Sequence, residues 1–272
     1  MNEKVFFITG STDGIGKLTA IDLATQQKEA TILIHGRNKE KLEKSVADIQ
    51  SASGNPHIES WLADFSSMDE VRSIAIEILS KHPSIDILIN NAGAGFAAPR
   101  YGKDGTEMRF AVNYLAPFLL TRLLLPALKK TSASRIVHVA SAGQSAIHFD
   151  DIMLKNKFDA VTAYTQSKLA LIMFNMDLAE ELLPDHITVN SLHPGTYLDT
   201  GMVREAGISP QGTAQSGADA IVYLAGSPDL ENVTGKYFNV KKEARAHAQA
   251  YDAAARKKLN EIGLMLTGLH SA

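Results

Sequence analysis

The sequence predicts an α/β fold, a single doubly wound domain with a parallel sheet of about seven strands and helices on both faces. Short apolar runs rich in β-branched residues alternate with longer segments of helical spacing. The runs are almost continuously apolar, as in strands that are buried on both sides. Proline and glycine do not cluster into a linker, so we expect one domain over residues 1–240 and a tail, 241–272, that packs on or near the substrate side.

The predicted elements follow one another regularly along the chain. Strands are expected at 5–9, 31–35, 58–62, 85–89, 135–140 and 187–192. Helices are expected at 15–27, 39–51, 107–129, 160–183 and 211–224, with another beginning after Ser67. Ser67 and Glu70 have the spacing of a capping box. The tail is rich in alanine and lysine, which predicts a helix followed by irregular chain.

Composition excludes several classes of protein. The 272 residues carry 27 Lys+Arg and 30 Asp+Glu, a net charge of −3, which gives no attraction to nucleic acid or anionic lipid. The lack of cysteine excludes disulfides, thiolate zinc sites and a cysteine nucleophile, and the histidines show no compact metal spacing, so no metal is expected. No run of about 18 uncharged apolar residues exists, and the first residues enter a strand at once. We therefore expect a cytoplasmic protein without a membrane anchor.

A glycine-rich loop joins the first predicted strand to the first predicted helix. Glycines there let backbone N–H groups approach an anion, and the helix dipole favours negative charge. A Walker A loop has four residues between its first glycine and its Gly-Lys pair, and a Ser or Thr after the lysine. Here five residues separate Gly10 from Gly16, and Leu18 follows Lys17, so this phosphoryl-transfer loop is disfavoured. The spacing G-x3-G-x-G also departs from the G-x-G-x-x-G of many dinucleotide sites, and a turn without a ligand is the alternative. The position between strand and helix favours a phosphate site made by Gly10, Ser11, Asp13, Gly14, Ile15 and Gly16.

The end of the second predicted strand is where the ribose of a dinucleotide would lie. An acidic residue there would accept a hydrogen bond from a free 2′-hydroxyl and favour NAD. This chain has Arg37-Asn38 instead, and a guanidinium can pair with a 2′-phosphate. The predicted cofactor is therefore NADP, with a solvated arginine as the alternative reading of Arg37.

Reduction of a carbonyl requires a positioned acid, because hydride transfer leaves an oxyanion. Tyr164 and Lys168 lie one helical turn apart, and a neighbouring cation lowers the pKa of a phenol. With seven tyrosines in the chain, about half a Tyr-x3-Lys pair is expected by chance, and a second pair does occur, Tyr237 with Lys241. That pair falls in a strand-like stretch, where residues four apart are separated by about 13 Å. Tyr164 is therefore the candidate acid.

Together these motifs resemble the short-chain dehydrogenase/reductase family in its classical form, over nearly the whole chain. Residues 9–16 are similar to the family's TGxxxGIG loop, residues 90–93 to its NNAG element, and Tyr164 with Lys168 to its YxxxK pair. The retinol-dehydrogenase-like branch is the most similar, because of the long segment between Ser141 and Tyr164 and the ending of the chain.

The resemblance implies a Rossmann fold and a role for each matched residue. Tyr164 would act as acid and base, Lys168 would lower its pKa and hold the nicotinamide ribose, and Ser141 would hydrogen-bond the substrate oxygen. Asn113 would help to hold a water chain. Further cofactor contacts are implied for Arg37, Asn38, Asp64, Phe65, Asn91, Ala92, Gly93, Pro194, Gly195 and Thr196. In this family the helix corresponding to 118–128 often packs against a second subunit, which makes a homo-oligomer a further expectation.

The predicted function is hydride transfer between NADP(H) and an alcohol or carbonyl substrate, with Tyr164 as the general acid/base. The alternative is a non-catalytic NADP sensor on the same fold, although a sensor has no need of a proton relay. Epimerases and dehydratases of the extended family are disfavoured by glycine spacing and chain length. We expect the substrate pocket to be formed by the segment after Ser141, residues 196–210 and the tail.

Overall fold

The computed structural model describes residues 4–131 and 133–270, which contain one eight-stranded sheet. Its order is β3-β2-β1-β4-β5-β6-β7-β8, and every pair is parallel except β7–β8. The strands are β1 (Val5–Ile8), β2 (Thr31–Gly36), β3 (Ile58–Leu62), β4 (Ile87–Asn90), β5 (Arg135–Val139), β6 (Thr188–His193), β7 (Tyr237–Asn239) and β8 (Lys242–Ala244). The α/β class is confirmed, with one strand more than the expected number.

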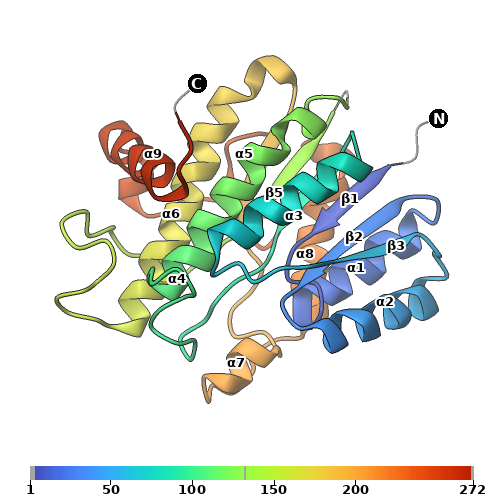
Figure 1. Ribbon diagram of the computed structural model, residues 1–272, viewed down its shortest axis with the longest axis horizontal. Coiled ribbons are helices and arrows are strands. Elements are labelled where there is room, and N and C mark those ends of the chain that lie inside the picture. The colour runs from blue at the N-terminus through green and yellow to red at the C-terminus, as the bar shows by residue number, and fades with distance from the viewer. Residues whose placement is uncertain (1–3, 132, 271–272) are drawn as a thin grey trace.

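Helices cover both faces of the sheet (Figure 1). One face carries α1 (Gly14–Gln26), α2 (Lys39–Ser53) and α8 (Ala214–Gly226). The other carries α3 (Met68–Lys81), α5 (Ala116–Leu128) and α6 (Ala160–Glu181). The strands from β1 to β7 therefore contribute side chains to two separate cores, which explains why most of the strand sequences are apolar on both sides.

Short polar side chains begin most of the helices. Asp13, Asn38 and Asp159 accept hydrogen bonds from the first-turn N–H groups of α1, α2 and α6. The capping box expected at Ser67 is wrong, because the Ser67 side chain makes no capping bond. The Glu70 carboxylate instead accepts from the N–H of Asp64, three residues before the cap, since the turn after β3 folds back over the helix.

The predicted helix 107–129 is present as one continuous helical segment that changes from α-helical to π-helical and back. It comprises α4 (Met108–Phe110), a π-helical turn η1 (Ala111–Leu115) and α5. By length and composition Met108–Leu128 could cross a membrane, which the sequence expectation did not foresee, but 78% of its apolar window is buried inside the fold. It is the core helix between α3 and α6, and the location of the protein in the cell stays a prediction.

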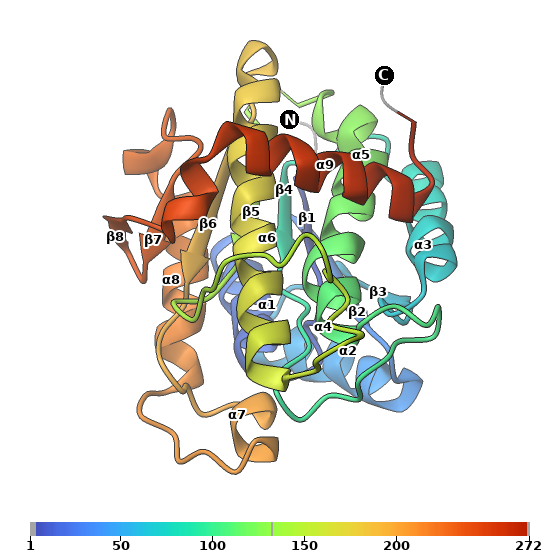
Figure 2. The ribbon, with the colours of Figure 1, turned by 90° about the vertical axis from the view of Figure 1, so that its left-hand side faces the viewer.

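The C-terminal region differs from the predicted helix followed by irregular chain. A tight turn at Val240, which has a positive φ of 57°, returns β7 into the antiparallel strand β8. The short helices η3 (Pro228–Leu230) and η4 (Ala248–Tyr251) flank this hairpin, η2 (Leu183–Asp185) follows α6, and α9 (Ala253–Thr267) ends the region. Figure 2 shows α9 lying across α6 and α5, at the end of the molecule away from α7 (Gly201–Glu205).

The tail is tied to this helical face by specific contacts. The Tyr114 hydroxyl donates to the carbonyl of Leu259, and Arg256 pairs with Asp177 and Glu180 of α6. The short helix η4 before α9 also contacts the segment after Ser141, since the Gln249 side chain accepts from the N–H of Ile147. The chain's own tail therefore covers α6 and the π turn.

Candidate functional site

A cavity of about 620 Å³ opens at the carboxyl ends of β1, β2, β4, β5 and β6. The strand order reverses between β1 and β4, so the loops that follow these strands diverge and leave a crevice there. Most predicted site residues line it: Gly10, Asp13, Gly14, Ile15, Gly16, Arg37, Asn38, Asp64, Phe65, Asn91, Ala92, Gly93, Ser141, Tyr164, Lys168, Pro194, Gly195 and Thr196. Ser11 and Asn113 do not.

The glycine loop is packed too tightly for side chains at two positions. A Cβ on Gly16 would lie 2.3 Å from both the Asn91 amide nitrogen and the Gly10 carbonyl oxygen. A Cβ on Gly10, which has a positive φ of 63°, would lie 2.7 Å from the Ala92 Cα. Asn91 fixes the position of the loop relative to β4, because its side-chain amide donates to the carbonyls of Thr9 and Gly10. The loop thus presents bare backbone at the N-terminus of α1, which suits a phosphate group.

Ser11 holds the glycine loop against the ends of β1 and β2. Its hydroxyl donates to the Ile8 carbonyl and accepts from the N–H of His35, and its side chain is fully buried. The N–H of Gly10 donates to His35 Nδ1, and the ring stacks on Phe65 with centroids 3.9 Å apart. Burial lowers the pKa of His35 to about 4, so the imidazole is neutral at physiological pH and can accept this bond.

The end of β2 carries an arginine, Arg37, whose positive charge helps to lower the pKa of the Asp64 carboxyl group. Arg37 is exposed, and within residues 4–131 and 133–270 it makes no hydrogen bond or ion pair. The exposed Lys41 lies in the first turn of α2 and lines the same part of the cavity, a second cation that the sequence analysis missed. The Asn38 side chain caps α2 by accepting from the N–H of Lys41. Since Arg37 and Lys41 are both cationic, this corner of the cavity suits an anionic group.

Tyr164, Lys168 and Ser141 meet on the opposite side of the cavity. Tyr164 and Lys168 share one face of α6, and the ammonium lies 5.9 Å from the centre of the Tyr164 ring. Lys168 donates to the Val139 carbonyl at the end of β5, over a distance of 2.8 Å. Ser141 Oγ accepts from the N–H of Gly143 and forms a hydrogen bond with Tyr164, so the two hydroxyl groups lie together in the cavity.

Burial dominates the protonation of this group. It raises the pKa of Tyr164, and the hydrogen bond with Ser141 opposes that rise. It also lowers the pKa of Lys168 to about 8. Burial and Ser141 account for the Tyr164 pKa in this structure, and the lowering by Lys168, whose ammonium lies 5.9 Å from the ring centre and donates to Val139, stays a prediction.

Asn113 lies in the π turn, behind the cavity wall. Its side-chain oxygen accepts from the N–H of Ala94, and its amide donates to the Ala94 carbonyl and to Ser167 Oγ. Ser167 Oγ donates in turn to the Tyr164 carbonyl. The extra residue of a π turn rotates the helix surface, which turns this side chain toward the loop after β4. Asn113 therefore connects that loop to the helix that carries Tyr164.

The segment after β6 lies over the mouth of the cavity. A Cβ on Gly201 would lie 2.9 Å from the Asp13 carboxylate, and one on Gly95 would lie 2.5 Å from Met202. This segment therefore touches both the glycine loop and the loop after β4. The described residues of the tail do not line the cavity, so the expectation that the tail helps to build the pocket is wrong; it contacts the segment after Ser141 from outside.

Two aromatic residues near Tyr164 were missed or set aside by the sequence analysis. Phe96 packs on the Tyr164 ring with centroids 4.7 Å apart; its position three residues after the NNAG element is the only sequence signal for it. Tyr237 is separated from Lys241, whose ammonium lies 5.7 Å from the Tyr223 ring. The Tyr237 hydroxyl instead donates to the Ser141 carbonyl, so this residue supports Ser141 from behind.

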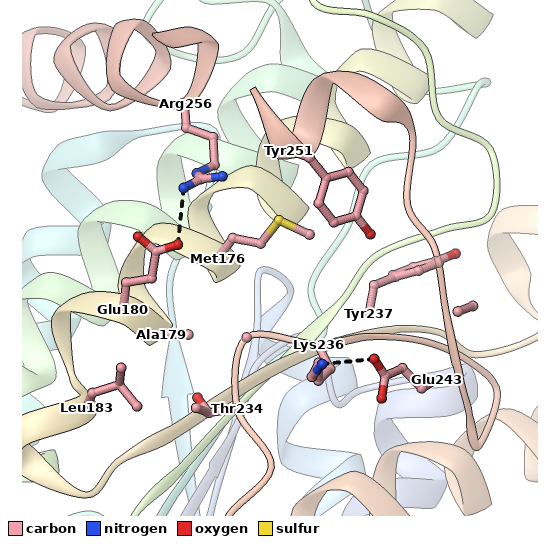
Figure 3. A pocket seen from close by; sticks show the side chains of 12 residues that line it. Met176, Ala179, Glu180, Leu183, Thr234, Lys236, Tyr237, Glu243, Tyr251 and Arg256 are labelled. Atoms are coloured by element: carbon pink, nitrogen blue, oxygen red, sulfur yellow. Dashed lines mark hydrogen bonds and ion pairs between the residues drawn. The ribbon is translucent and has the colours of Figure 1, made fainter. Parts of the chain in front are cut away.

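A second cavity of about 340 Å³ lies between α6, the β7–β8 hairpin and the segment that leads into α9 (Figure 3). Its charged groups pair with each other, Lys236 with Glu243 and Arg256 with Glu180. It holds no converging set of catalytic side chains. In the part of the chain that the structure describes, no cluster of three His, Asp or Glu could hold a metal ion.

Comparisons with known proteins agree with this geometry. Residues 4–211 match the short chain dehydrogenase family. Retinol dehydrogenase 13 of Mus musculus is 35% identical, over 99% of this chain and 85% of that protein. The Pseudomonas aeruginosa RhlG/NADP active-site complex has a TM-score of 0.70 at 27% identity, covering 87% of this chain and 94% of that chain. The 3-ketoacyl-(acyl-carrier-protein) reductase from Brucella melitensis complexed with NADH has a TM-score of 0.68 at 25% identity, with coverages of 87% and 96%.

The chain therefore belongs to the short-chain dehydrogenase family, and within it to the retinol-dehydrogenase-like branch. It is a nicotinamide-dependent oxidoreductase that acts on a small-molecule substrate. The family and the enzyme class expected from the sequence are confirmed.

Proposed function

We propose that this protein interconverts a carbonyl compound and its alcohol with NADP(H), and that Tyr164 is the general acid/base. The observation that carries the proposal is the meeting of a phenol, a hydroxyl and an ammonium, from Tyr164, Ser141 and Lys168, in the cavity that also holds the glycine loop. The hydroxyl and phenol suit a carbonyl oxygen, and the loop suits a phosphate.

The residues fit a dinucleotide for steric and electrostatic reasons. At Gly10 and Gly16 a Cβ would clash with backbone or with Asn91, so the loop needs glycines there to pack, and its bare backbone lines the cavity where a pyrophosphate would lie. Arg37 and Lys41 offer two cations where a 2′-phosphate would lie, which supports NADP over NAD. When bound, the nicotinamide supplies the hydride in reduction and accepts it in oxidation.

The protein's own groups handle the proton. In reduction the Tyr164 hydroxyl donates its proton to the carbonyl oxygen, while Ser141 Oγ donates a hydrogen bond to the same oxygen. Lys168, held by Val139, stabilises the phenolate that remains and provides donors for the ribose. In oxidation the phenolate of Tyr164 takes the proton of the alcohol.

Asn113 takes part by positioning. Both amide hydrogens are used within the protein, by Ala94 and Ser167, and the side chain is fully buried. We assign it to holding the loop after β4 against α6, in place of the water-chain role that the resemblance implied for this side chain.

The direct experiment is to mix the purified protein with NADPH and a panel of carbonyls and to follow oxidation of the cofactor at 340 nm. Tyr164→Phe should lower kcat by at least about 10²-fold, because the phenolic proton is lost while the ring and its packing remain. The NADPH dissociation constant should change little. Full turnover by Tyr164→Phe would contradict the acid/base role, and NADPH binding without turnover of any carbonyl would favour the sensor.

A further inference from the structure

The loop from Ala94 to Pro99 forms the cavity wall beside Tyr164. Phe96 is half-buried in this wall, and its ring meets the Tyr164 ring at an interplanar angle of 57°. The substrate must bring its carbonyl oxygen to the Tyr164 hydroxyl. A ring packed against Tyr164 therefore limits the bulk that can sit beside the reacting carbon.

A buried arginine holds this loop in place. Arg109 of α4 is 1% exposed, and its guanidinium donates to three loop carbonyls, those of Phe96 at 2.8 Å, Ala98 at 2.5 Å and Pro99 at 2.9 Å. The planar fork of an arginine can reach several acceptors at once, which an ammonium cannot do with the same geometry.

Glu107 compensates the charge of Arg109. One carboxylate oxygen lies 3.0 Å from Arg109 Nη1, and the other accepts from the N–H of Phe110, the last residue of α4. Glu107 is 0% exposed, so both charges of the pair have lost their hydration. A buried pair is costly unless its remaining donors and acceptors are satisfied. Here three loop carbonyls and Glu107 accept from the Nη1 and Nη2 groups of Arg109, and only the buried Nε–H has no partner among the described residues.

The same arginine reaches the long segment between Ser141 and Tyr164. The Phe158 ring contacts two guanidinium groups, with its centre 4.8 Å from that of Arg100 and 5.6 Å from that of Arg109. Arg100 also donates to the carbonyl of Leu154. The loop wall and the long segment are therefore joined through one cluster of two arginines and a phenylalanine.

We propose that Phe96 is a specificity-determining residue of the substrate pocket and that Arg109 is the positioning residue that holds it against Tyr164. This inference rests on the proposed carbonyl chemistry and extends it to substrate shape. The wall favours carbonyls with one small substituent, such as aldehydes with an extended apolar chain, over ketones with bulky groups on both sides. The other cavity residues nearby, Met108, Val112, Met202 and Ile208, are apolar and suit such a chain.

The test compares decanal with benzophenone, which carries a phenyl group on each side of the carbonyl. In Phe96→Ala the ratio of kcat/KM for decanal to that for benzophenone should fall at least about 10-fold, since removing a ring opens space beside the reacting carbon. The KM for NADPH should stay within about twofold. An unchanged ratio in this variant would overturn the proposal, whereas wild-type protein inactive with every carbonyl would overturn the proposed function and this inference together.

Arg109→Lys tests the positioning role. This substitution keeps the positive charge but loses the planar guanidinium that donates to three carbonyls. The ratio of kcat/KM for decanal to that for benzophenone should therefore fall, as in Phe96→Ala. The matched control is Arg256→Lys, because Arg256 is also a largely buried arginine that pairs with carboxylates but lies at the second cavity (Figure 3). The Arg256→Lys variant should have the same decanal-to-benzophenone ratio as the wild type.

A double-mutant cycle separates positioning from general destabilisation. If Arg109 acts through Phe96, Phe96→Ala/Arg109→Lys should have the ratio of Phe96→Ala alone, within about twofold. The role of Arg109 would be overturned if the fall of the ratio in the double variant equalled the product of the falls in the two single variants. A wild-type ratio in folded Arg109→Lys would overturn it as well. Thermal melts identify a variant that fails to fold; in that case Glu107→Gln, which keeps the shape of the Arg109 partner, takes its place with the same expected fall in the ratio.

Discussion

Lys168 links burial to the pH range in which the site can work. Its ammonium is enclosed by β5 and α6, and burial lowers its pKa from 10.5 to about 8. As the pH rises through 8 the cation is lost, and with it the charge that would stabilise the phenolate of Tyr164. At lower pH the ammonium is charged and Tyr164 keeps its proton, because burial raises the phenol pKa.

We therefore predict that kcat/KM for carbonyl reduction falls as the pH rises above about 8. Lys168→Arg keeps a positive charge throughout this range, so in this variant the break should move to higher pH even if the overall rate is lower. A pH profile of kcat/KM from 6 to 10 measures both. A break that stays near 8 in Lys168→Arg would show that another group is responsible.

Arg37 allows a second test at the residue scale, because its exposed guanidinium lines the cavity and can pair with a ligand. Arg37→Ala should raise the KM for NADPH by about 10- to 100-fold, the loss of a charge-assisted hydrogen bond of about 1.5–3 kcal/mol. The KM for NADH should change little. Lys39→Ala is the control, since Lys39 lies nearby with a side chain that is 74% exposed but does not line the cavity. Equal increases for both cofactors in Arg37→Ala would contradict the 2′-phosphate assignment.

At the scale of elements, the junction of β1 and α1 depends on the missing side chain of Gly16. Gly16→Ala would place a Cβ against the Gly10 carbonyl and Asn91, so overpacking should cost about 1–3 kcal/mol and weaken NADPH binding. Gly226→Ala in α8 is the matched control, because nothing lies within 4 Å of a Cβ there. Thermal melts with and without NADPH measure both effects. A melting temperature equal to that of the wild type in Gly16→Ala would contradict the close packing.

The helix starts show how far local sequence patterns extend. Asp13 and Asn38 cap their helices as short polar side chains do, because the partner N–H lies within the same turn. Glu70 has the same kind of pattern but bonds outside its helix, because Asp64 is brought back over α3 by the turn after β3. The π turn at Asn113 likewise depends on what the helix packs against, and the sequence spacing predicts only an ordinary helix.

At the scale of the whole molecule, α9 joins the tail to the core of the domain. Leu259 on the inner face of α9 is 1% exposed, whereas Met265 on the same helix is 70% exposed. We propose that residues 241–272 unfold together with residues 1–240. Leu259→Ala should destabilise by about 2–5 kcal/mol in a single transition, and Met265→Ala should have little effect. Chemical denaturation monitored by circular dichroism measures both, and a separate early transition in Leu259→Ala would contradict one cooperative unit.

The sequence by itself determined the alternation of strands and helices, the α/β class and the order of the motifs along the chain. These are carried by hydrophobic periodicity and by glycines at strand ends, which act over a few residues and are therefore visible in one sequence. It also separated Tyr164 from Tyr237, because one lies in a helical pattern and the other in a strand pattern.

Only the tertiary structure decided which distant groups meet. The bond from Tyr237 to the Ser141 carbonyl, the eighth strand, the covering of α6 by α9, and the three carbonyls held by Arg109 all join parts of the chain that the local pattern does not relate. The physical reason is that these contacts depend on how the sheet order and the loop lengths bring the chain together. The sequence does not indicate that Arg109 is buried or that its N–H groups donate to the carbonyls of Phe96, Ala98 and Pro99, because these contacts form only in the folded chain.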